Sequence, residues 1–190
     1  MKFIADFHIH SHYSLATSKS LTPEHLDYWA KLKGVDVLST GDCIHPGWLS
    51  ELKEKLTPNE RGFLSIKNEY KLQNINPYIF YPKHFQKKDT DFILTTEISN
   101  IYKKNGKTRK VHNLCIFPSF ESADKFQKKL DKIGNIRSDG RPILGLDSKI
   151  LLELLLETDE KAFLIPAHIW TPWFSVLGSR SGFDSIEECY

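Results

Sequence analysis

The sequence predicts an α/β fold in which strands and helices alternate around an inner sheet or barrel. One observation is that short apolar runs, typical of buried strands, alternate with segments that have the apolar spacing of amphipathic helices. The other is that polar residues able to bind metal recur at or near the ends of these strands. Strands are expected at residues 3–10, 35–40, 92–99, 109–117 and 161–168, and helices at residues 23–33, 46–56, 121–133 and 147–157.

The composition is that of an ordinary globular protein, with 40% hydrophobic and 26% charged residues. A length of 190 residues allows one domain with a substantial core, and this domain is expected to occupy residues 1–190. The net charge of +2 does not by itself indicate a nucleic-acid-binding protein. The three cysteines form no CxxC pair, so the sequence predicts neither a disulfide framework nor a cysteine-based zinc module. Without a signal peptide or a long apolar run, we expect a cytoplasmic protein that does not associate with membranes.

The first predicted strand carries Asp6, His8 and His10 between apolar residues. Side chains alternate between the two faces of a strand, so these three polar residues share one face. The two imidazoles lie about 7 Å apart along the strand and can converge on one metal ion. The alternative is a strand that merely carries two histidines. The neighbouring carboxylate on the same face favours metal binding.

A β-α-β unit is predicted from the elements that follow. Thr22 is expected to cap a helix that Gly34 ends, and the second strand then stops just before Asp42. Two strands joined through a helix should be parallel, with a right-handed crossover.

The middle of the chain combines an uncertain segment with a strong turn signal. Residues 57–90 are predicted to be an irregular insertion, because prolines and aromatic residues interrupt any regular pattern. The Asn105-Gly106 pair favours a tight turn, so the strands at 92–99 and 109–117 are expected to form an antiparallel hairpin.

The predicted strand ends bring four imidazoles and two carboxylates toward one place: His8, His10, Asp42, Glu97, His112 and His168. The carboxyl ends of parallel strands meet at one crevice, and an antiparallel strand that begins there joins them. Without cations these groups would be costly to bury together. Divalent metals remove that cost, and Glu97 could bridge two of them in a site that hydrolyses phosphoesters.

Each of these residues also has a plainer explanation when it is taken alone. Asp42 could be a turn residue or a helix cap, and Glu97 could pair with a lysine. His112 and His168 could be structural histidines that are satisfied by hydrogen bonds. The repetition at strand ends, rather than any one position, favours a metal site. His45, close after Asp42 in the chain, is expected to line it.

The ordered motifs resemble those of the polymerase and histidinol phosphatase (PHP) superfamily. Its Asp-x-His-x-His motif matches residues 6–10, its strand-end glutamate matches Glu97, and its later histidines match His112 and His168. Its Thr-Asp-His motif matches residues 40–43 imperfectly, because a glycine is inserted and a cysteine replaces the histidine. The resemblance implies a distorted, TIM-like β/α barrel that holds two or three divalent ions (Zn, Mn, Mg or Fe) and hydrolyses phosphoesters.

The final Asp-x-His motif of this superfamily is absent from the sequence. We therefore expect an N-terminal fragment whose barrel is incomplete, because the chain ends before the last strands. The fragment alone is expected to be inactive.

Within the superfamily, residues 40–48, 165–173 and 179–185 look most like the endonuclease Q branch. This resemblance implies a metal-dependent DNA repair endonuclease that cleaves the phosphodiester next to deaminated bases such as uracil or hypoxanthine, and at abasic sites. It also implies DNA as the partner, with Asp42 and Glu97 as catalytic residues.

The ligands are expected to be divided between two metals that share Glu97, with His8 and His10 on one side and His112 and His168 on the other. Asp42 would be a further ligand or would position the attacking water. Asp6 would orient the ligating histidines or pack beneath them.

Three residues after the last ligand are candidates for substrate binding. Trp170, Trp173 and Arg180 could stack on an extruded base or bind phosphate. Alternatively, both tryptophans are core or domain-interface residues. Two other functions remain open at this point, a PHP phosphatase that acts on a small phosphomonoester and a non-catalytic PHP module that accompanies a helicase or polymerase.

Overall fold

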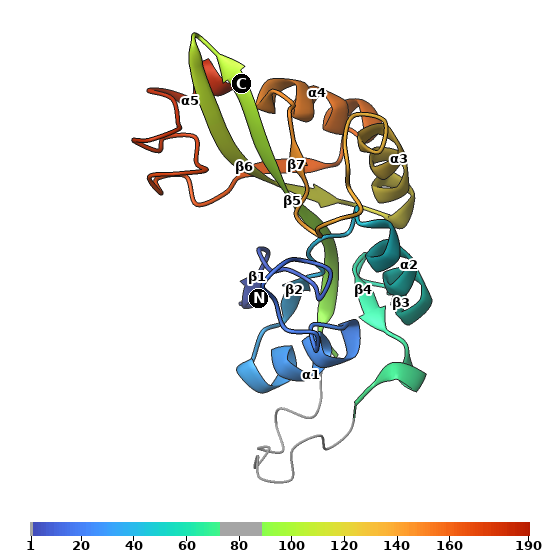
Figure 1. The fold of residues 1–190 in the computed structure, drawn as a ribbon. Coiled ribbons are helices and arrows are strands. Elements are labelled where there is room, and N and C mark those ends of the chain that lie inside the picture. The colour runs from blue at the N-terminus through green and yellow to red at the C-terminus, as the bar shows by residue number, and fades with distance from the viewer. Residues whose placement is uncertain (1, 73–88) are drawn as a thin grey trace.

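The computed structural model describes residues 2–72 and 89–190, and it confirms the predicted α/β class (Figure 1). Within these residues one sheet has the order β1-β2-β5-β4-β3, and β6, β7 and β8 extend it from the far part of β5. The strands are β1 (Ala5–Asp6), β2 (Val37–Ser39), β3 (Leu56–Pro58), β4 (Leu64–Ile66), β5 (Asp91–Lys104), β6 (Lys107–Phe117), β7 (Ile143–Leu144) and β8 (Phe163–Pro166). The helices are α1 (Pro23–Lys33), α2 (Pro46–Lys55), the 3₁₀ helix η1 (Asn68–Tyr70), α3 (Phe120–Leu130), α4 (Ser148–Thr158) and α5 (Ile186–Cys189).

Strand β5 joins the two halves of the sheet. Its first three residues pair in parallel with β2, whereas the rest of the strand pairs antiparallel with β6 and, over two residues, parallel with β7. The long strand therefore runs through both halves of the molecule (Figure 1), and the sheet curls around it as a half-barrel. Any side chain near the middle of β5 lies where the two halves meet.

The predicted β-α-β unit is present. β1 and β2 pair in parallel, with Ala5 opposite Val37. Thr22 is at the N-cap position of α1, but its side chain makes no capping hydrogen bond. Gly34 ends the helix in the left-handed region at φ 71°. The Gly34 amide donates to the carbonyls of Ala30 and Lys31, which is the glycine end that the sequence predicts.

The predicted hairpin is confirmed, but its strands are longer than expected. Asn105 and Gly106 both have positive φ, as a two-residue hairpin turn requires. Pairing between β5 and β6 continues without interruption up to Lys104 and Lys107, at the turn. The prediction that β5 ends near Glu97 is therefore wrong, because the hairpin extends well past the end of β2.

The prediction of a buried first strand is also wrong. β1 has only two residues, and Phe3 and Ile4 are 61% and 60% exposed. Among the described residues β1 pairs with β2 alone, so its other edge is uncovered and nothing buries these side chains.

The helices that pack on the sheet match their predictions, apart from small shifts at the ends. Ser119 and Asp147 cap α3 and α4 through their side-chain oxygens. α3 ends three residues before Ile133, the last residue of the predicted helix, and Ile133 is 44% exposed. The core between these helices and the sheet is dominated by large, fully buried side chains that include Trp48, Phe92, Phe117, Phe126 and Leu151.

The segment predicted to be irregular contains regular structure in its first half. β3 pairs antiparallel with β4, and η1 follows before residue 73. The remainder of that predicted insertion, residues 73–88, lies outside the described residues. None of the helices in the described part of the chain is both long and apolar enough to cross a membrane.

Gly41 is expected to be irreplaceable in this fold. Its φ is +61°, and an added Cβ would collide with the Ile9 carbonyl and lie 3.0 Å from the His10 Cα. Gly62 has a comparable φ of +80° but open space around it. We expect Gly62→Ala to lower the free energy of unfolding by about 1 kcal/mol, and Gly41→Ala by clearly more. Chemical denaturation measures both, and equal losses in the two variants would contradict the packing argument.

Candidate metal centre

The buried carboxylate of Glu97 lies at the centre of four imidazoles. Its side chain is 1% exposed. Oε1 lies 3.1 Å from His8 Nε2, 3.0 Å from His112 Nδ1 and 3.4 Å from His168 Nε2. Oε2 lies 3.4 Å from His10 Nε2. The structure thus brings together five of the six residues that the sequence places near strand ends.

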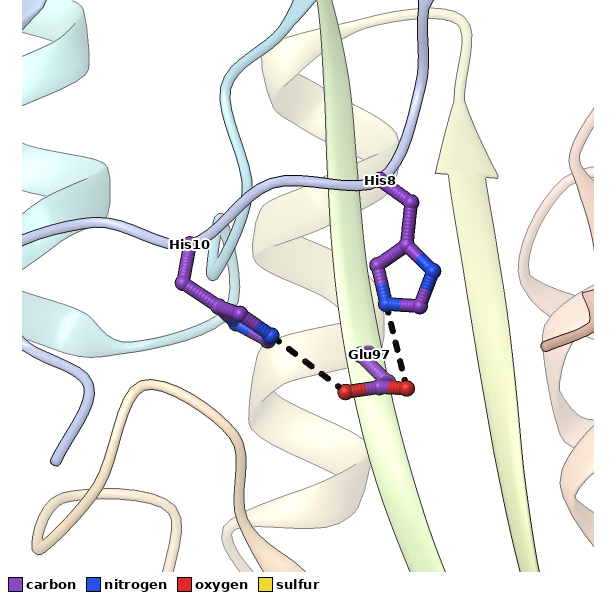
Figure 2. A group of neighbouring side chains, drawn as sticks. All are labelled: His8, His10 and Glu97. Atoms are coloured by element: carbon purple, nitrogen blue, oxygen red, sulfur yellow. Dashed lines mark ion pairs between the residues drawn. The ribbon is translucent and has the colours of Figure 1, made fainter. Parts of the chain in front are cut away.

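Four separate segments deliver these side chains. His8 and His10 come from the chain that follows β1 and reach Glu97 from one side (Figure 2). Glu97 lies four residues beyond Ile93, the last residue of β5 that pairs with β2. The segment after β2 stays beside β5, since the amides of Thr40 and Cys43 donate to the carbonyls of Ile93 and Thr95.

The other two histidines reach Glu97 from the second half of the sheet. Glu97 lies opposite Leu114, so His112, two residues earlier on β6, is on the same face. His168 follows β8, and the amide of Ala167 donates to the His112 carbonyl. The rings of His112 and His168 are consequently 3.2 Å apart between Nδ1 and Nε2.

These residues form two groups of potential ligands that share one carboxylate. His8, His10 and Glu97 place one ligand atom each within 4.8 Å of one another. Glu97, His112 and His168 do the same. A shared carboxylate between two pairs of imidazoles is the arrangement in which one glutamate can bridge two ions.

The chemistry of the donor set fits divalent transition metals. Glu97 Oε1 is buried and accepts no hydrogen bond from any described residue, although three ring nitrogens lie within 3.4 Å of it. An unsatisfied buried carboxylate oxygen is costly. Imidazole nitrogens and a carboxylate oxygen that face one point without hydrogen bonding are suited to Zn, Mn or Fe.

The electrostatics of the cluster keep the carboxylate ionised. Burial raises the pKa of Glu97, but the contacts with the rings of His10, His112 and His8 outweigh it and hold this pKa well below its usual range. Contacts with Asp42 and then Glu97 raise the pKa of His10 to about 9. Burial lowers the pKa of His168, which favours the neutral imidazole that binds metal.

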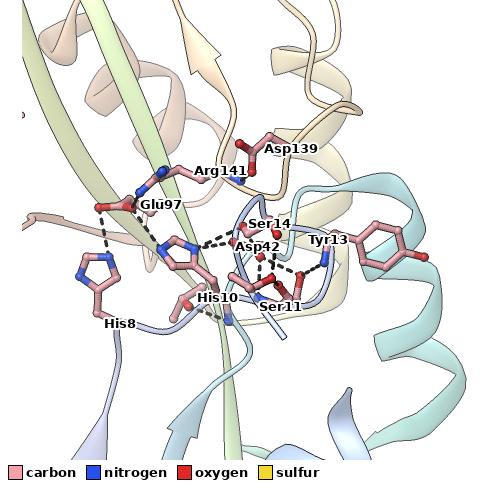
Figure 3. A network of polar contacts seen from close by, with 12 residues as sticks. His8, His10, Ser11, Tyr13, Ser14, Asp42, Glu97, Asp139 and Arg141 are labelled. Atoms are coloured by element: carbon pink, nitrogen blue, oxygen red, sulfur yellow. Dashed lines mark hydrogen bonds and ion pairs between the residues drawn. The ribbon is translucent and has the colours of Figure 1, made fainter. Parts of the chain in front are cut away.

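Asp42 lies behind His10 rather than beside the other ligands (Figure 3). It is fully buried, and its Oδ1 is 3.0 Å from His10 Nδ1. Its Oδ2 accepts hydrogen bonds from the Ser11 amide at 2.6 Å, the Ser11 hydroxyl at 2.7 Å and the Ser14 hydroxyl at 2.8 Å. Both carboxylate oxygens of Asp42 are thus occupied, Oδ1 by His10 and Oδ2 by the two serines. The contact with Nδ1 turns His10 Nε2 toward Glu97.

No contact in the described structure joins the side chain of Asp6 to the ring of His8 or His10. It is exposed, and its Oδ1 accepts from the backbone amide of His8 at 3.1 Å. Asp42, 36 residues later in the sequence, is therefore the carboxylate that contacts the ring of His10, as had been expected of Asp6.

Backbone strain also concentrates at this centre. Asp42 and His168 have positive φ values of 46° and 30°, which L-residues with side chains rarely adopt. Such conformations cost about 1–2 kcal/mol each and persist where surrounding contacts impose them.

The structure separates the residues predicted to bind substrate into two classes. His45 is 8% exposed and caps α2, with Nδ1 accepting from the Trp48 amide and Nε2 facing the Arg137 carbonyl at 2.9 Å. Trp170 and Trp173 are 78% and 51% exposed on the loop that follows β8. They are not core residues of this chain.

Arg141 is the residue of the centre that sequence reasoning missed. Its Nη1 lies 3.6 Å from Glu97 Oε2, and its side chain is 40% exposed (Figure 3). The Gly140 amide donates to the Tyr13 carbonyl, and Asp139 Oδ1 accepts from the Leu15 amide, so this loop is held against the segment that follows His10. The loop between α3 and β7 has no strand-end pattern, and nothing in the sequence indicated it.

No family model matches the chain, but solved structures and one curated protein do. The lesion-specific endonuclease PfuEndoQ from Pyrococcus furiosus is 32% identical, with a TM-score of 0.75 over 99% of this chain and 39% of its own. An endonuclease Q in complex with a 27-mer duplex substrate that has an abasic lesion at the active site is 33% identical, with a TM-score of 0.76 over 99% of this chain and 40% of its own.

The curated relative is the uncharacterized protein MJ0043 of Methanocaldococcus jannaschii, which is 32% identical over 182 residues. That match covers 95% of this chain and 18% of the relative. The chain therefore spans less than half of each of these proteins. In fold and sequence it is similar to the corresponding part of endonuclease Q.

The contact between the 139–141 loop and Asp42 supplies a test of the centre. A Cβ added at Gly140 would collide with the Asp42 carboxylate and lie 2.6 Å from Ser14 Oγ, whereas a Cβ at Gly145 would meet only the Ile101 carbonyl at 4.0 Å. We expect Gly140→Ala to weaken metal binding about 10- to 100-fold by displacing Asp42 from His10. Titration of the metal-free protein with Zn²⁺ or Mn²⁺ measures the affinity.

Gly145→Ala is the matched control and should bind metal as the unchanged protein does. Equal affinities in the two variants would show that the position of Asp42 does not matter to the ligands.

Proposed function

We propose that this chain contributes the metal centre of a DNA repair endonuclease that hydrolyses the phosphodiester beside a deaminated base or an abasic site. The observation that carries the proposal is the single buried carboxylate, Glu97, shared by two pairs of imidazoles. The similarity to endonuclease Q, including a complex with lesion-containing duplex DNA, supports DNA as the substrate. We further infer that the half-barrel is part of a distorted β/α barrel of the PHP type.

In this proposal the ligands divide as the geometry groups them. His8, His10 and Glu97 would hold one divalent ion, and Glu97, His112 and His168 a second. Bound at these residues, divalent ions would supply an activated water and would neutralise charge on the leaving oxygen. A set of imidazoles with one carboxylate favours Zn, Mn or Fe over Mg, which prefers oxygen ligands, and a third ion would need ligands from elsewhere.

Asp42 acts in this scheme as a positioning residue. Its carboxylate fixes the ring of His10 and holds Nδ1 protonated, so that Nε2 is the nitrogen presented to the ion. The three donors from Ser11 and Ser14 keep the Asp42 carboxylate in place. A direct role of Asp42 as ligand would require it to give up some of these contacts.

Arg141 is placed to bind the phosphate that is cleaved. A guanidinium binds phosphate through parallel hydrogen bonds and stabilises the negative charge that grows during hydrolysis. Arg141 is half-exposed and lies beside Glu97, so it can bind a phosphate oxygen while the imidazoles hold the ions. Trp170 and Trp173, exposed on the neighbouring loop, are available to stack on bases near the lesion.

Replacing the shared carboxylate tests the proposal directly. In the full-length protein we expect Glu97→Gln to lower the rate of nicking of a uracil-containing duplex by at least about a hundredfold, with Mg²⁺ or Mn²⁺ present. Bound metal, measured by mass spectrometry, should fall in parallel. Glu121→Gln is the control, because Glu121 is exposed on α3 and pairs with Lys125. Full activity of Glu97→Gln would refute the proposed centre.

Arg141 should affect the chemical step without affecting metal content. We expect Arg141→Ala to lower the single-turnover nicking rate at saturating DNA about a hundredfold, and Arg141→Lys to restore part of the loss. Arg137→Ala is a suitable control, since Arg137 is exposed and pairs with Asp131. A loss of bound metal in Arg141→Ala would instead assign Arg141 a structural role at Glu97.

A further inference from the structure

A cavity lined by basic residues lies apart from the metal centre, between the start of β6 and the loop that follows β8. Residues 177–184 of that loop enclose a cavity of about 400 Å³ with residues 107–109 of the hairpin. In Figure 1 this loop is the long red segment beside β6. The cavity is lined by three cations and one carboxylate: Lys107, Arg109, Arg180 and Asp184.

The cations of this cavity lack the counter-charges that other arginines in the described structure have. Arg61, Arg137 and Arg141 each form an ion pair with a carboxylate. Arg109 and Arg180 form none within the described residues, and neither does Lys107. Both arginines without an ion pair thus line this one cavity. With three cations and one carboxylate around it, the cavity has a net positive charge.

Arg109 is buried although its charge is not neutralised. It is 7% exposed, its guanidinium lies 4.2 Å from the Phe183 ring centroid, and it donates to the Gly182 carbonyl. Its Nε has no hydrogen-bond partner in the described structure. A buried charge without a counter-ion is costly, so an anion in the adjacent cavity would compensate it.

The loop around the cavity is held in one conformation before any ligand binds. The Gly182 amide donates to the Gly178 carbonyl at 2.8 Å, and the Arg180 amide to the Pro172 carbonyl at 2.9 Å. A Cβ at Gly182 would collide with the backbone of Gly178, so only glycine allows this close approach. A preformed site loses little conformational entropy when it binds a ligand.

We infer that this cavity binds a backbone phosphate of the DNA strand, away from the phosphate that is cleaved; this inference rests on the proposed function. Arg109 precedes His112 by three residues on β6, about 10 Å along the strand, and its side chain leaves the opposite face of that strand. A phosphate bound in this cavity would therefore be a different one from the phosphate at the metal centre, a few nucleotides away at most. The exposed ring of Trp173 lies 5.2 Å from Lys110 Nζ, and Lys110 shares a face of β6 with His112.

The inference is tested by DNA binding of the full-length protein, measured by fluorescence anisotropy. The probe is a duplex that contains an abasic site, with Ca²⁺ in place of Mg²⁺ to separate binding from cleavage. Arg180→Ala and Lys107→Ala change exposed side chains of the cavity, and Lys103→Ala removes an exposed charge from the same hairpin outside the cavity. Circular dichroism melting confirms that each variant is folded.

We expect Arg180→Ala and Lys107→Ala each to weaken binding severalfold and to reduce the slope of log affinity against log salt by about 1. Lys103→Ala should leave both quantities unchanged. A neutral methylphosphonate, placed at successive positions along the strand, should abolish the effect of Arg180→Ala at one position only, away from the cleaved bond.

Two failures can be distinguished. If the protein nicks lesion-containing DNA but the cavity variants bind with unchanged affinity and salt slope, the phosphate site is refuted and the proposed function stands. If the cavity variants lose affinity with that position dependence but Glu97→Gln changes no activity, the phosphate site stands and the proposed metal-dependent cleavage does not.

Discussion

The arrangement of this protein depends on the burial of one carboxylate, Glu97, among imidazoles. Its side chain is 1% exposed and lies on β5, which belongs to both halves of the sheet. Such a group would be strongly destabilising without polar partners, and the half-barrel supplies imidazoles from β6, from the end of β8 and from the segment after β1. The fold and the centre are therefore coupled, because β5, β6 and the segments that follow β1 and β8 each deliver a potential ligand atom.

Much of this was predictable from local sequence, because local signals decide local structure. Gly34 ends α1 and Asn105-Gly106 turns the hairpin as expected, since each conformation is a property of those residues themselves. The exposure of Phe3 was not predictable, because a short apolar run indicates a strand but not whether another strand covers its edge. The length of β5 was not predictable either, since only the pairing partner shows where an antiparallel ladder stops.

The membership of the centre was predictable in part, for the same reason. The histidines that contact Glu97 could be found from their positions on predicted strands, and His8, His10, His112 and His168 are all brought to it, although His112 lies within β6 and not at its end. Arg141 lies on a loop with no periodic pattern, and only tertiary packing brings it there. A sequence shows that His10 can bind a metal, but it does not show that Asp42 contacts its Nδ1 and leaves Nε2 to face Glu97.

Asp42 also holds in place the segment that carries His8 and His10, which is the most weakly attached part of the centre. β1 is two residues long and pairs along one edge in the described structure, so the ladder alone holds His8 and His10 weakly. The donors to Asp42 come from His10, Ser11 and Ser14, which belong to that same segment. The buried carboxylate of Asp42 thus holds this segment on one side of the His10 ring, and Glu97 lies on the other side. Because an ion bound between His8, His10 and Glu97 would add bonds to the same weakly held segment, metal binding and the folding of this edge of the sheet are thermodynamically coupled.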